Sequence, residues 1–211
     1  MSETWVRRAY DAAGLTQYPA GTGLRAIQAG LSGSVILCLD VSGSMWSQDG
    51  TPSTRLDRAK RGARQFVADA RRNGYQVGLI AWNEGVLSET KLGASDDKLE
   101  AHLASLMPGG GNDIQPTLHR CWEELSGLAG DRVVAIFGDG DLGPAEPAKL
   151  LAGELASDGI RIITKGLGDD SARTLDSIST EMLKTPRAAS AETLEADIAA
   201  MSAGLKKPGA R

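Results

Sequence analysis

Apolar residues gather in short blocks along most of this chain, and polar segments separate the blocks. The run Val35 to Leu39 is apolar at every position and ends at Asp40, which predicts a strand buried on both faces. Gln76 to Trp82, Arg132 to Phe137 and Ile160 to Leu167 predict further strands. Such strands are typical of a parallel sheet that is covered by helices on both sides.

Between these blocks, apolar residues recur at helical spacing. Leu56 begins one such series, and Thr54 with Asp57 before it resembles a capping box, so a helix is predicted to start there. The same spacing predicts helices in segments 95–106 and 114–125, around Leu150, Leu151 and Leu155, and in segments 171–179 and 191–205.

The order of these elements predicts an α/β fold. Val86 to Leu92, after the turn at Gly85, is typical of an antiparallel edge strand, and a weak last strand is expected near Leu183 to Ala188. We therefore expect a doubly wound, mostly parallel sheet of about six strands, with one antiparallel edge strand and helices on both faces. Residues 1–30 do not follow this alternation and are expected to form an N-terminal extension, with a helix around residues 4–13, before a domain at 31–207.

Composition narrows the class of protein. Of 211 residues, 41% are hydrophobic and 24% charged, which is ordinary for a globular domain and excludes a disordered chain. A net charge of −4 without a dense Lys/Arg block argues against nucleic acid as the main partner. No apolar run approaches the roughly 20 residues of a membrane helix, and no apolar segment follows Arg7 and Arg8 as in a secretory signal. We therefore expect a cytoplasmic protein that does not contact a membrane.

Cysteine and histidine offer little chemistry here. Cys38 and Cys121 are the only cysteines, and both are expected to be buried, inert thiols. His102 and His119 fall in predicted helices, away from the strand ends, and are expected to have ordinary packing or surface roles.

Oxygen donors follow two of the predicted strands. Asp40, Ser42 and Ser44 alternate directly after the first strand, and Asp139 follows the strand that ends at Phe137. The loop Gly109 to Asp113 supplies three glycines for close backbone approach and the further donors Asn112 and Asp113. Carboxylates and hydroxyls at the carboxyl end of a parallel sheet suit Mg²⁺ or Mn²⁺. Zinc is not expected, because there is no Cys/His cluster.

The motif Asp-x-Ser-x-Ser after a buried strand, with the Gly-rich loop and the later Asp-Gly, resembles the von Willebrand factor type A (VWA) domain over residues 32–205. Its strand-end residues resemble the metal-ion-dependent adhesion site (MIDAS) of that family. The resemblance implies that Ser42 and Ser44 ligate a metal directly, while Asp40 and Asp139 act mainly through water. It also implies that Asp113 lies just behind the ligands or contacts a bound partner.

One position departs from the family pattern. The family usually has Thr where this chain has Asn112, whose longer amide would have to reach the metal from a shifted loop. Two interpretations stay open: a metal-dependent interaction module completed by a partner's carboxylate, and a metal-free module with a degenerate site. Trp46 is either an anchor for a partner or a cap on its own loop, whereas Met45 and Trp82 are expected in the core.

An enzymatic function fits the sequence less well. Phosphatases of the haloacid dehalogenase type need a second acid where this chain has Ser42, although a Mg²⁺-dependent hydrolase of this sort is a weaker alternative. The nucleophile elbow of serine hydrolases and the phosphate-binding loop with its Lys are both absent. The resemblance is to stand-alone bacterial VWA proteins, which implies a non-enzymatic protein with an acidic protein partner, in the setting of an AAA-type ATPase system.

Overall fold

A six-stranded sheet forms the centre of the computed structural model, which describes residues 33–139, 141–181, 188–190 and 192–206. The strand order is β3-β2-β1-β4-β5-β6, and every neighbouring pair is parallel except β2 with β3. The strands are β1 (Ser34–Asp40), β2 (Gln76–Trp82), β3 (Val86–Thr90), β4 (Arg132–Gly138), β5 (Ile160–Leu167) and β6 (Ala188–Ala189). The predicted α/β architecture with one antiparallel strand is confirmed.

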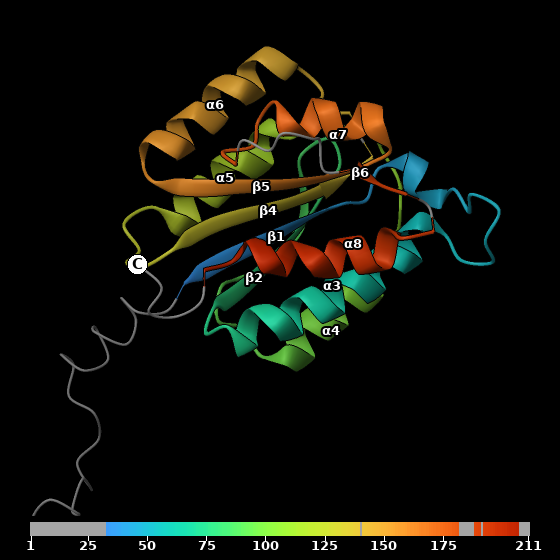
Figure 1. Ribbon diagram of the computed structural model, residues 1–211, viewed down its shortest axis with the longest axis horizontal. Helices are drawn as coiled ribbons and strands as arrows, with labels where there is room; N and C mark the ends of the chain where they lie inside the picture. The colour runs from blue at the N-terminus through green and yellow to red at the C-terminus, as the bar shows by residue number, and fades with distance from the viewer. Residues whose placement is uncertain (1–32, 140, 182–187, 191, 207–211) are drawn as a thin grey trace, which may run out of the picture.

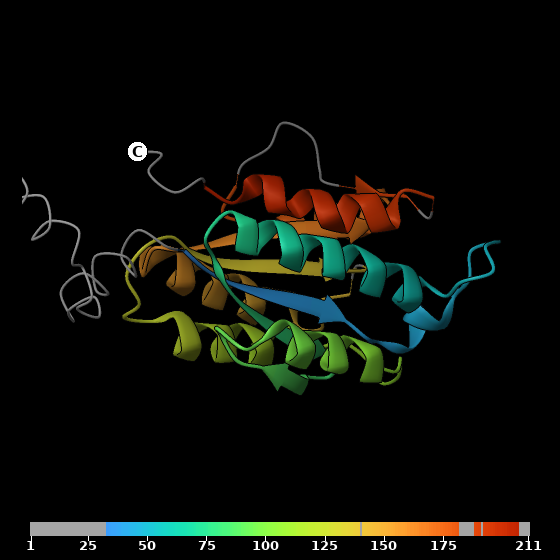
Figure 2. The same ribbon diagram turned by 90° about the horizontal axis from the view of Figure 1, so that it is seen from below.

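Helices cover both faces of the sheet (Figures 1 and 2). One face carries α3 (Arg55–Arg72), α4 (Asp96–Ser105) and α8 (Leu194–Ala200), and the other carries α5 (Gln115–Leu125), α6 (Ala145–Ser157) and α7 (Asp169–Asp176). Two short 3₁₀ helices, η1 (Gly43–Trp46) and η2 (Met201–Gly204), follow β1 and α8.

Alternate residues of the central strands belong to two separate hydrophobic cores, one on each face of the sheet. In β1, Val35, Leu37 and Leu39 pack beneath α3, α4 and α8, whereas Ile36 and Cys38 pack beneath α5 and α6. A strand that is apolar at every position is stable only in such a double-sided setting. The Sγ atoms of Cys38 and Cys121 lie 3.4 Å apart as buried free thiols, as the sequence predicts.

The start of α3 is fixed by its predicted capping box. The Thr54 hydroxyl accepts a hydrogen bond from the Asp57 backbone N–H at 3.1 Å, and the Asp57 carboxylate accepts one from the Thr54 backbone N–H at 3.2 Å. Farther along, Gly62 lies against α8, where an added Cβ would stand 2.5 Å from the Glu195 carbonyl oxygen. The helix is therefore held at both its start and its middle, beside the carboxyl end of β1.

Some expected elements differ or fall elsewhere. The helix predicted over 191–205 is divided into α8 and η2, and β6 is shorter than the strand predicted near 183–188, most of which lies outside the described residues. The expected extension at 1–30, with its helix at 4–13, also lies outside them. Among the described helices, none combines the length and apolar character that crossing a membrane requires.

Candidate metal site

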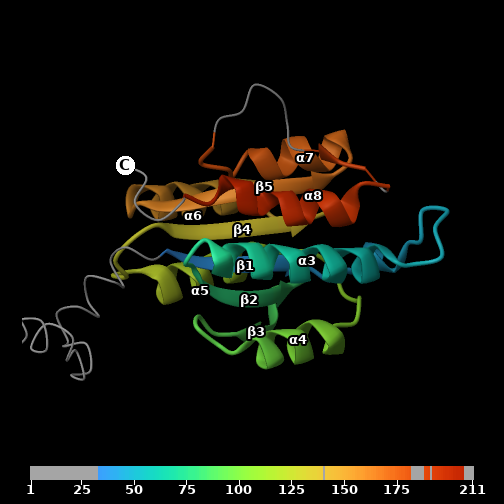
Figure 3. The same cartoon turned by 60° about the horizontal axis from the view of Figure 1, so that its bottom comes forward.

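The candidate residues gather at the carboxyl ends of β1 and β4, which are neighbours at the centre of the sheet. The chain leaves β1 toward β2 on one side, and β4 begins the half of the sheet on the other side, so the strand order reverses here. Open α/β sheets bind ligands at such a reversal. Figure 3 shows the segment between β1 and α3 projecting beyond this end of the sheet.

Asp40 connects three loops at this edge. Its side chain is fully buried at the end of β1, and its Oδ1 accepts a hydrogen bond from the Ser42 backbone N–H at 2.7 Å. Its Oδ2 lies 3.2 Å from the backbone N–H of Asp139 and 3.4 Å from Nδ2 of Asn112. Gly138 permits this approach, since a Cβ there would stand 3.1 Å from Oδ2. The structure thus brings Asp40, Asn112 and Asp139 together.

The two serines present their hydroxyls side by side. The Oγ atoms of Ser42 and Ser44 lie 3.0 Å apart, so one small ligand could contact both. Met45 is fully buried and anchors η1 in the core, while Trp46 directs 54% of its surface to solvent. The prediction that Met45 lies in the core is confirmed, as is the same prediction for Trp82.

The Gly-rich loop docks onto the loop that carries the serines. The Gly109 backbone N–H donates to the Val41 carbonyl at 2.8 Å, and the Gly43 N–H donates to the Gly110 carbonyl at 3.1 Å. Gly110 has φ +79°, a conformation that favours glycine. Asn83 adds a hydrogen bond from its Nδ2 to the Gly109 carbonyl at 3.0 Å, a contribution that the sequence analysis missed.

Asp113 serves the start of α5. Its Oδ1 accepts hydrogen bonds from the backbone N–H of Gln115 at 3.0 Å and from the Gln115 side chain at 3.3 Å. Its own backbone N–H donates to the Asn83 carbonyl at 2.7 Å. The structure therefore shows Asp113 holding the loop and helix that present Asn112.

A second carboxylate completes the charged part of the site. The side chain of Asp139 is 8% exposed, and its backbone carbonyl oxygen accepts a hydrogen bond from the Ser171 hydroxyl at 2.5 Å. Burial, and after it the negative charge of Asp139, together raise the pKa of Asp40 from its ordinary value of 3.8 to about 6. Two carboxylates that lie close together in a partly buried site repel each other, so they favour a cation between or beside them.

A cation of the protein itself already contacts this site. Nη1 of Arg55, the first residue of α3, lies 3.2 Å from Oδ2 of Asp139. The other edge of the guanidinium holds Asp49 through Nε to Oδ2 and Nη2 to Oδ1, both at 2.7 Å. Nothing in the sequence pattern pointed to Arg55, because 84 residues separate it from Asp139.

The family assignment follows from comparison with known proteins. The sequence profile described as "von Willebrand factor type A domain" matches residues 35–141, just over half of the 211 residues. The chain belongs to the VWA family. The matched segment runs from β1 to just past β4 and contains all the candidate site residues.

Solved structures share the VWA fold of this chain. The vWF domain of the type V pilus tip protein Mfa5 from Porphyromonas gingivalis has a TM-score of 0.69 at 14% identity, over 85% of this chain and 98% of that one. BatB from Bacteroides thetaiotaomicron has a TM-score of 0.54 at 24% identity, over 64% of this chain and 66% of that one. Comparison with curated protein sequences gives no match.

A third neighbour is described with its metal site filled. Proximal thread matrix protein 1 from the mussel byssus, in a structure described as having a zinc-occupied MIDAS motif, has a TM-score of 0.61 at 15% identity. The alignment covers 83% of this chain and 46% of the mussel protein, so this chain spans less than half of that protein's length.

The donors of this VWA domain fit a hard divalent cation. Within the described residues, no three His, Cys, Asp or Glu side chains form a cluster, so a cation at this edge would depend on hydroxyl oxygens besides the carboxylates. Ser42 and Ser44 provide a close pair of them, beside the buried carboxylate of Asp40. Hydroxyl and carboxylate oxygens are the ligand types that Mg²⁺ and Mn²⁺ prefer.

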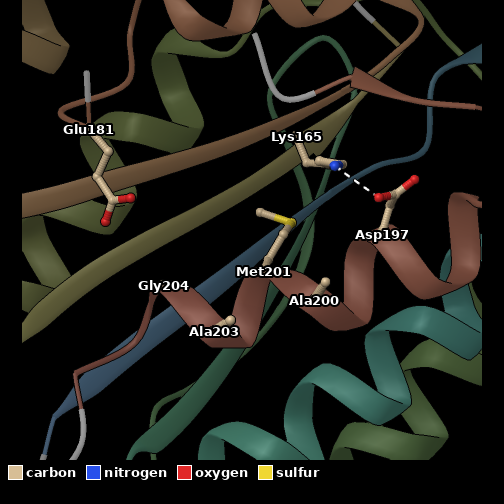
Figure 4. Close-up of a pocket in the computed structure, with 7 residues that line it drawn as sticks. All are labelled: Lys165, Glu181, Asp197, Ala200, Met201, Ala203 and Gly204. Atoms are coloured by element: carbon tan, nitrogen blue, oxygen red, sulfur yellow. Dashed lines mark ion pairs between the residues drawn. The ribbon is translucent and has the colours of Figure 1, made fainter. Parts of the chain in front are cut away.

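A pocket of about 420 Å³ lies elsewhere in the domain, between β5 and the α8–η2 segment (Figure 4). The Lys165 ammonium and the Asp197 carboxylate form an ion pair of 2.9 Å at one side of it, and Met201 projects between the helix and the strand. None of the candidate metal-site residues lines this pocket.

Proposed function

We propose that this VWA domain is a divalent-cation-dependent module for binding another protein. Ser42 and Ser44 would hold Mg²⁺ or Mn²⁺ directly, Asp40 and Asp139 would hold it mainly through water, and Asn112 would stand in the place of the family's usual Thr. When bound, the cation would supply a coordination position open to an oxygen anion. The observation that carries the proposal is the pair of hydroxyls 3.0 Å apart beside the buried carboxylate of Asp40.

The chemistry of the partner follows from this arrangement. A carboxylate is the side-chain anion that completes a hard cation's coordination, so the partner would present an Asp or Glu. Trp46, exposed on the 3₁₀ helix that carries Ser44, would contact the surface around that acid. An AAA-type ATPase system is the setting that the family resemblance suggests, and the domain itself would recognise its partner without transforming it.

A metal-free interaction module is the second candidate. Two observations favour it: Arg55 already neutralises part of the charge of Asp139, and Asn112 directs its amide nitrogen toward Asp40. In that case the same edge of the sheet would bind its partner through Trp46 and the surrounding backbone, without a cation.

Thermal unfolding separates the two candidates. Saturation at 100 times Kd stabilises a domain by about 2.7 kcal/mol, which corresponds to roughly 5–10 °C at this size. We expect a rise of this order in Mg²⁺ or Mn²⁺ over EDTA, and no rise in a Ser42→Ala/Ser44→Ala variant. Ser126→Ala is the matched control. It removes a hydroxyl at the end of α5 that is bonded to Asp158 and not to the site, so the melting temperature should still rise with cation. An equal melting temperature of the wild type with and without cation would favour the metal-free module.

Capture of binding partners tests the second half of the proposal. Wild-type protein should retain a partner in Mg²⁺ and release it in EDTA, whereas the Ser42→Ala/Ser44→Ala variant should retain none in either buffer. Recovery that is the same in all four conditions would contradict a role for the cation in recognition.

A further inference from the structure

Arg55 occupies an unusual position for a surface arginine. All three nitrogen positions of its guanidinium are engaged: Nε and Nη2 hold Asp49, and Nη1 reaches Asp139. Such fork geometry fixes the direction of an arginine side chain. Its backbone is also fixed, because its N–H donates to the Ser47 carbonyl at 2.7 Å.

The contacts of Asp49 hold the Arg55 guanidinium in this orientation. Besides the two bonds from Arg55, its carboxylate accepts a hydrogen bond from the Ser47 hydroxyl at 2.8 Å and forms an ion pair with Arg58 at 3.0 Å. Asp49 itself has φ +48°, the one described residue other than glycine in the left-handed region. The segment between β1 and α3 therefore aims a positive charge at Asp139.

This charge lies on a carboxylate that a metal site would use. Only 8% of the Asp139 side chain and 24% of the Arg55 side chain are exposed, so solvent screens their interaction weakly. A guanidinium bound to Asp139 lowers the negative charge available to a divalent cation and repels that cation directly. The guanidinium is also hydrogen-bonded to Asp49 through Nε and Nη2, so Arg55 keeps a partner when its contact with Asp139 is broken.

We propose that Arg55 is an internal competitor that sets the metal affinity of this VWA domain. It holds Asp139 when the site carries no divalent cation, and it yields Asp139, while keeping Asp49, when a cation binds. The inference rests on the proposed metal site and adds the residue that tunes it. It predicts that removing the guanidinium strengthens metal binding, the opposite of what loss of a structural contact would do.

Calorimetric titration of Mg²⁺ and Mn²⁺ into EDTA-treated, dialysed protein tests the proposal. Removing a unit charge a few ångströms from a divalent cation in a partly buried site should tighten binding about 10- to 100-fold, so Arg55→Gln should bind that much more strongly than wild type. Arg55→Lys, which keeps the charge, should change the affinity much less. Arg64→Gln is the matched control, because Arg64 lies on the same helix but forms its ion pair with Glu100. This variant should bind the cations with an affinity within about twofold of wild type.

Each outcome has a distinct meaning. Arg55→Gln binding as wild type does, or more weakly, would overturn the proposal and leave Arg55 as a structural contact. Tight binding by Arg55→Gln with none by the wild type would support the competitor and overturn the cation-dependent function of the natural chain. No binding by either protein would overturn both. If the circular dichroism of Arg55→Gln shows an unfolded chain, Arg55→Met, which keeps the apolar stem, replaces it with the same expected result.

Discussion

Replacing Asp40 by Asn should stabilise the cation-free domain, although it removes a central residue of the proposed site. The pKa of Asp40 is raised from 3.8 to about 6, and each pH unit of such a rise corresponds to about 1.4 kcal/mol, so keeping this carboxylate ionised costs about 3 kcal/mol at neutral pH. The side-chain oxygen of Asn still accepts the hydrogen bond from the Ser42 N–H. Its NH₂ group, however, faces the backbone N–H of Asp139 and Nδ2 of Asn112, so the hydrogen bonds from these two donors are lost. That loss costs roughly 1–2 kcal/mol. The net gain should be about 1–2 kcal/mol.

Urea unfolding in EDTA measures this gain, and its pH dependence checks the cause. The raised pKa means that the protonated form of Asp40 stabilises the fold fully below about pH 4, and this contribution is lost as the pH rises through about 6. The advantage of Asp40→Asn should therefore be largest at about pH 7, and below about pH 4 the wild type should be the more stable protein, because only the loss of hydrogen bonds in the variant then remains. Excess Mg²⁺ should reverse the order, because only the wild type gains from the cation. A variant that is less stable than wild type at every pH in EDTA would refute the reasoning.

Three further results are expected. Asn112→Thr should tighten Mg²⁺ binding severalfold in calorimetric titration, because a short hydroxyl replaces an amide that directs its nitrogen toward Asp40; weaker binding would contradict this. His102 is bound to Ser88 and Thr90, and burial lowers its pKa, so the contribution of His102 to the free energy of unfolding should fall as the pH drops below about 6.5. His102→Gln should lessen that fall in urea titrations. Trp46→Ala should change the unfolding free energy by at most about 0.5 kcal/mol yet reduce partner capture; unchanged capture would assign Trp46 no contact.

The strands were predicted well, because β1, β2 and β4 are buried on both faces and so are apolar at nearly every position. β1, β2, β4 and β5 lie where the apolar blocks place them, and β3 is the predicted antiparallel edge. The helix surfaces were harder to predict. In α6, Leu155 is fully buried, whereas Leu150, which belongs to the same apolar series, is 72% exposed because five positions along a helix turn it away from that face.

The site was predictable where its donors follow strand ends and not where they come from distant loops. Asp40, Ser42 and Ser44 alternate within five residues at the end of one strand, and Asp139 follows a recognisable strand beside it, so the sheet alone brings them together. The contacts of Arg55 with Asp139 depend on the path of the segment between β1 and α3, which no periodicity encodes. The cytoplasmic location and the domain boundary at residue 30 stay predictions.

Crystals of this VWA domain soaked in Mn²⁺ would test the central claim most directly, through the anomalous signal of the metal. The account predicts a single strong peak at the carboxyl end of β1, beside the hydroxyl oxygens of Ser42 and Ser44, with the Arg55 guanidinium moved off Asp139 and still bound to Asp49. Density that shows the Arg55–Asp139 pair intact, with no peak beside the two serines at saturating Mn²⁺, would contradict it.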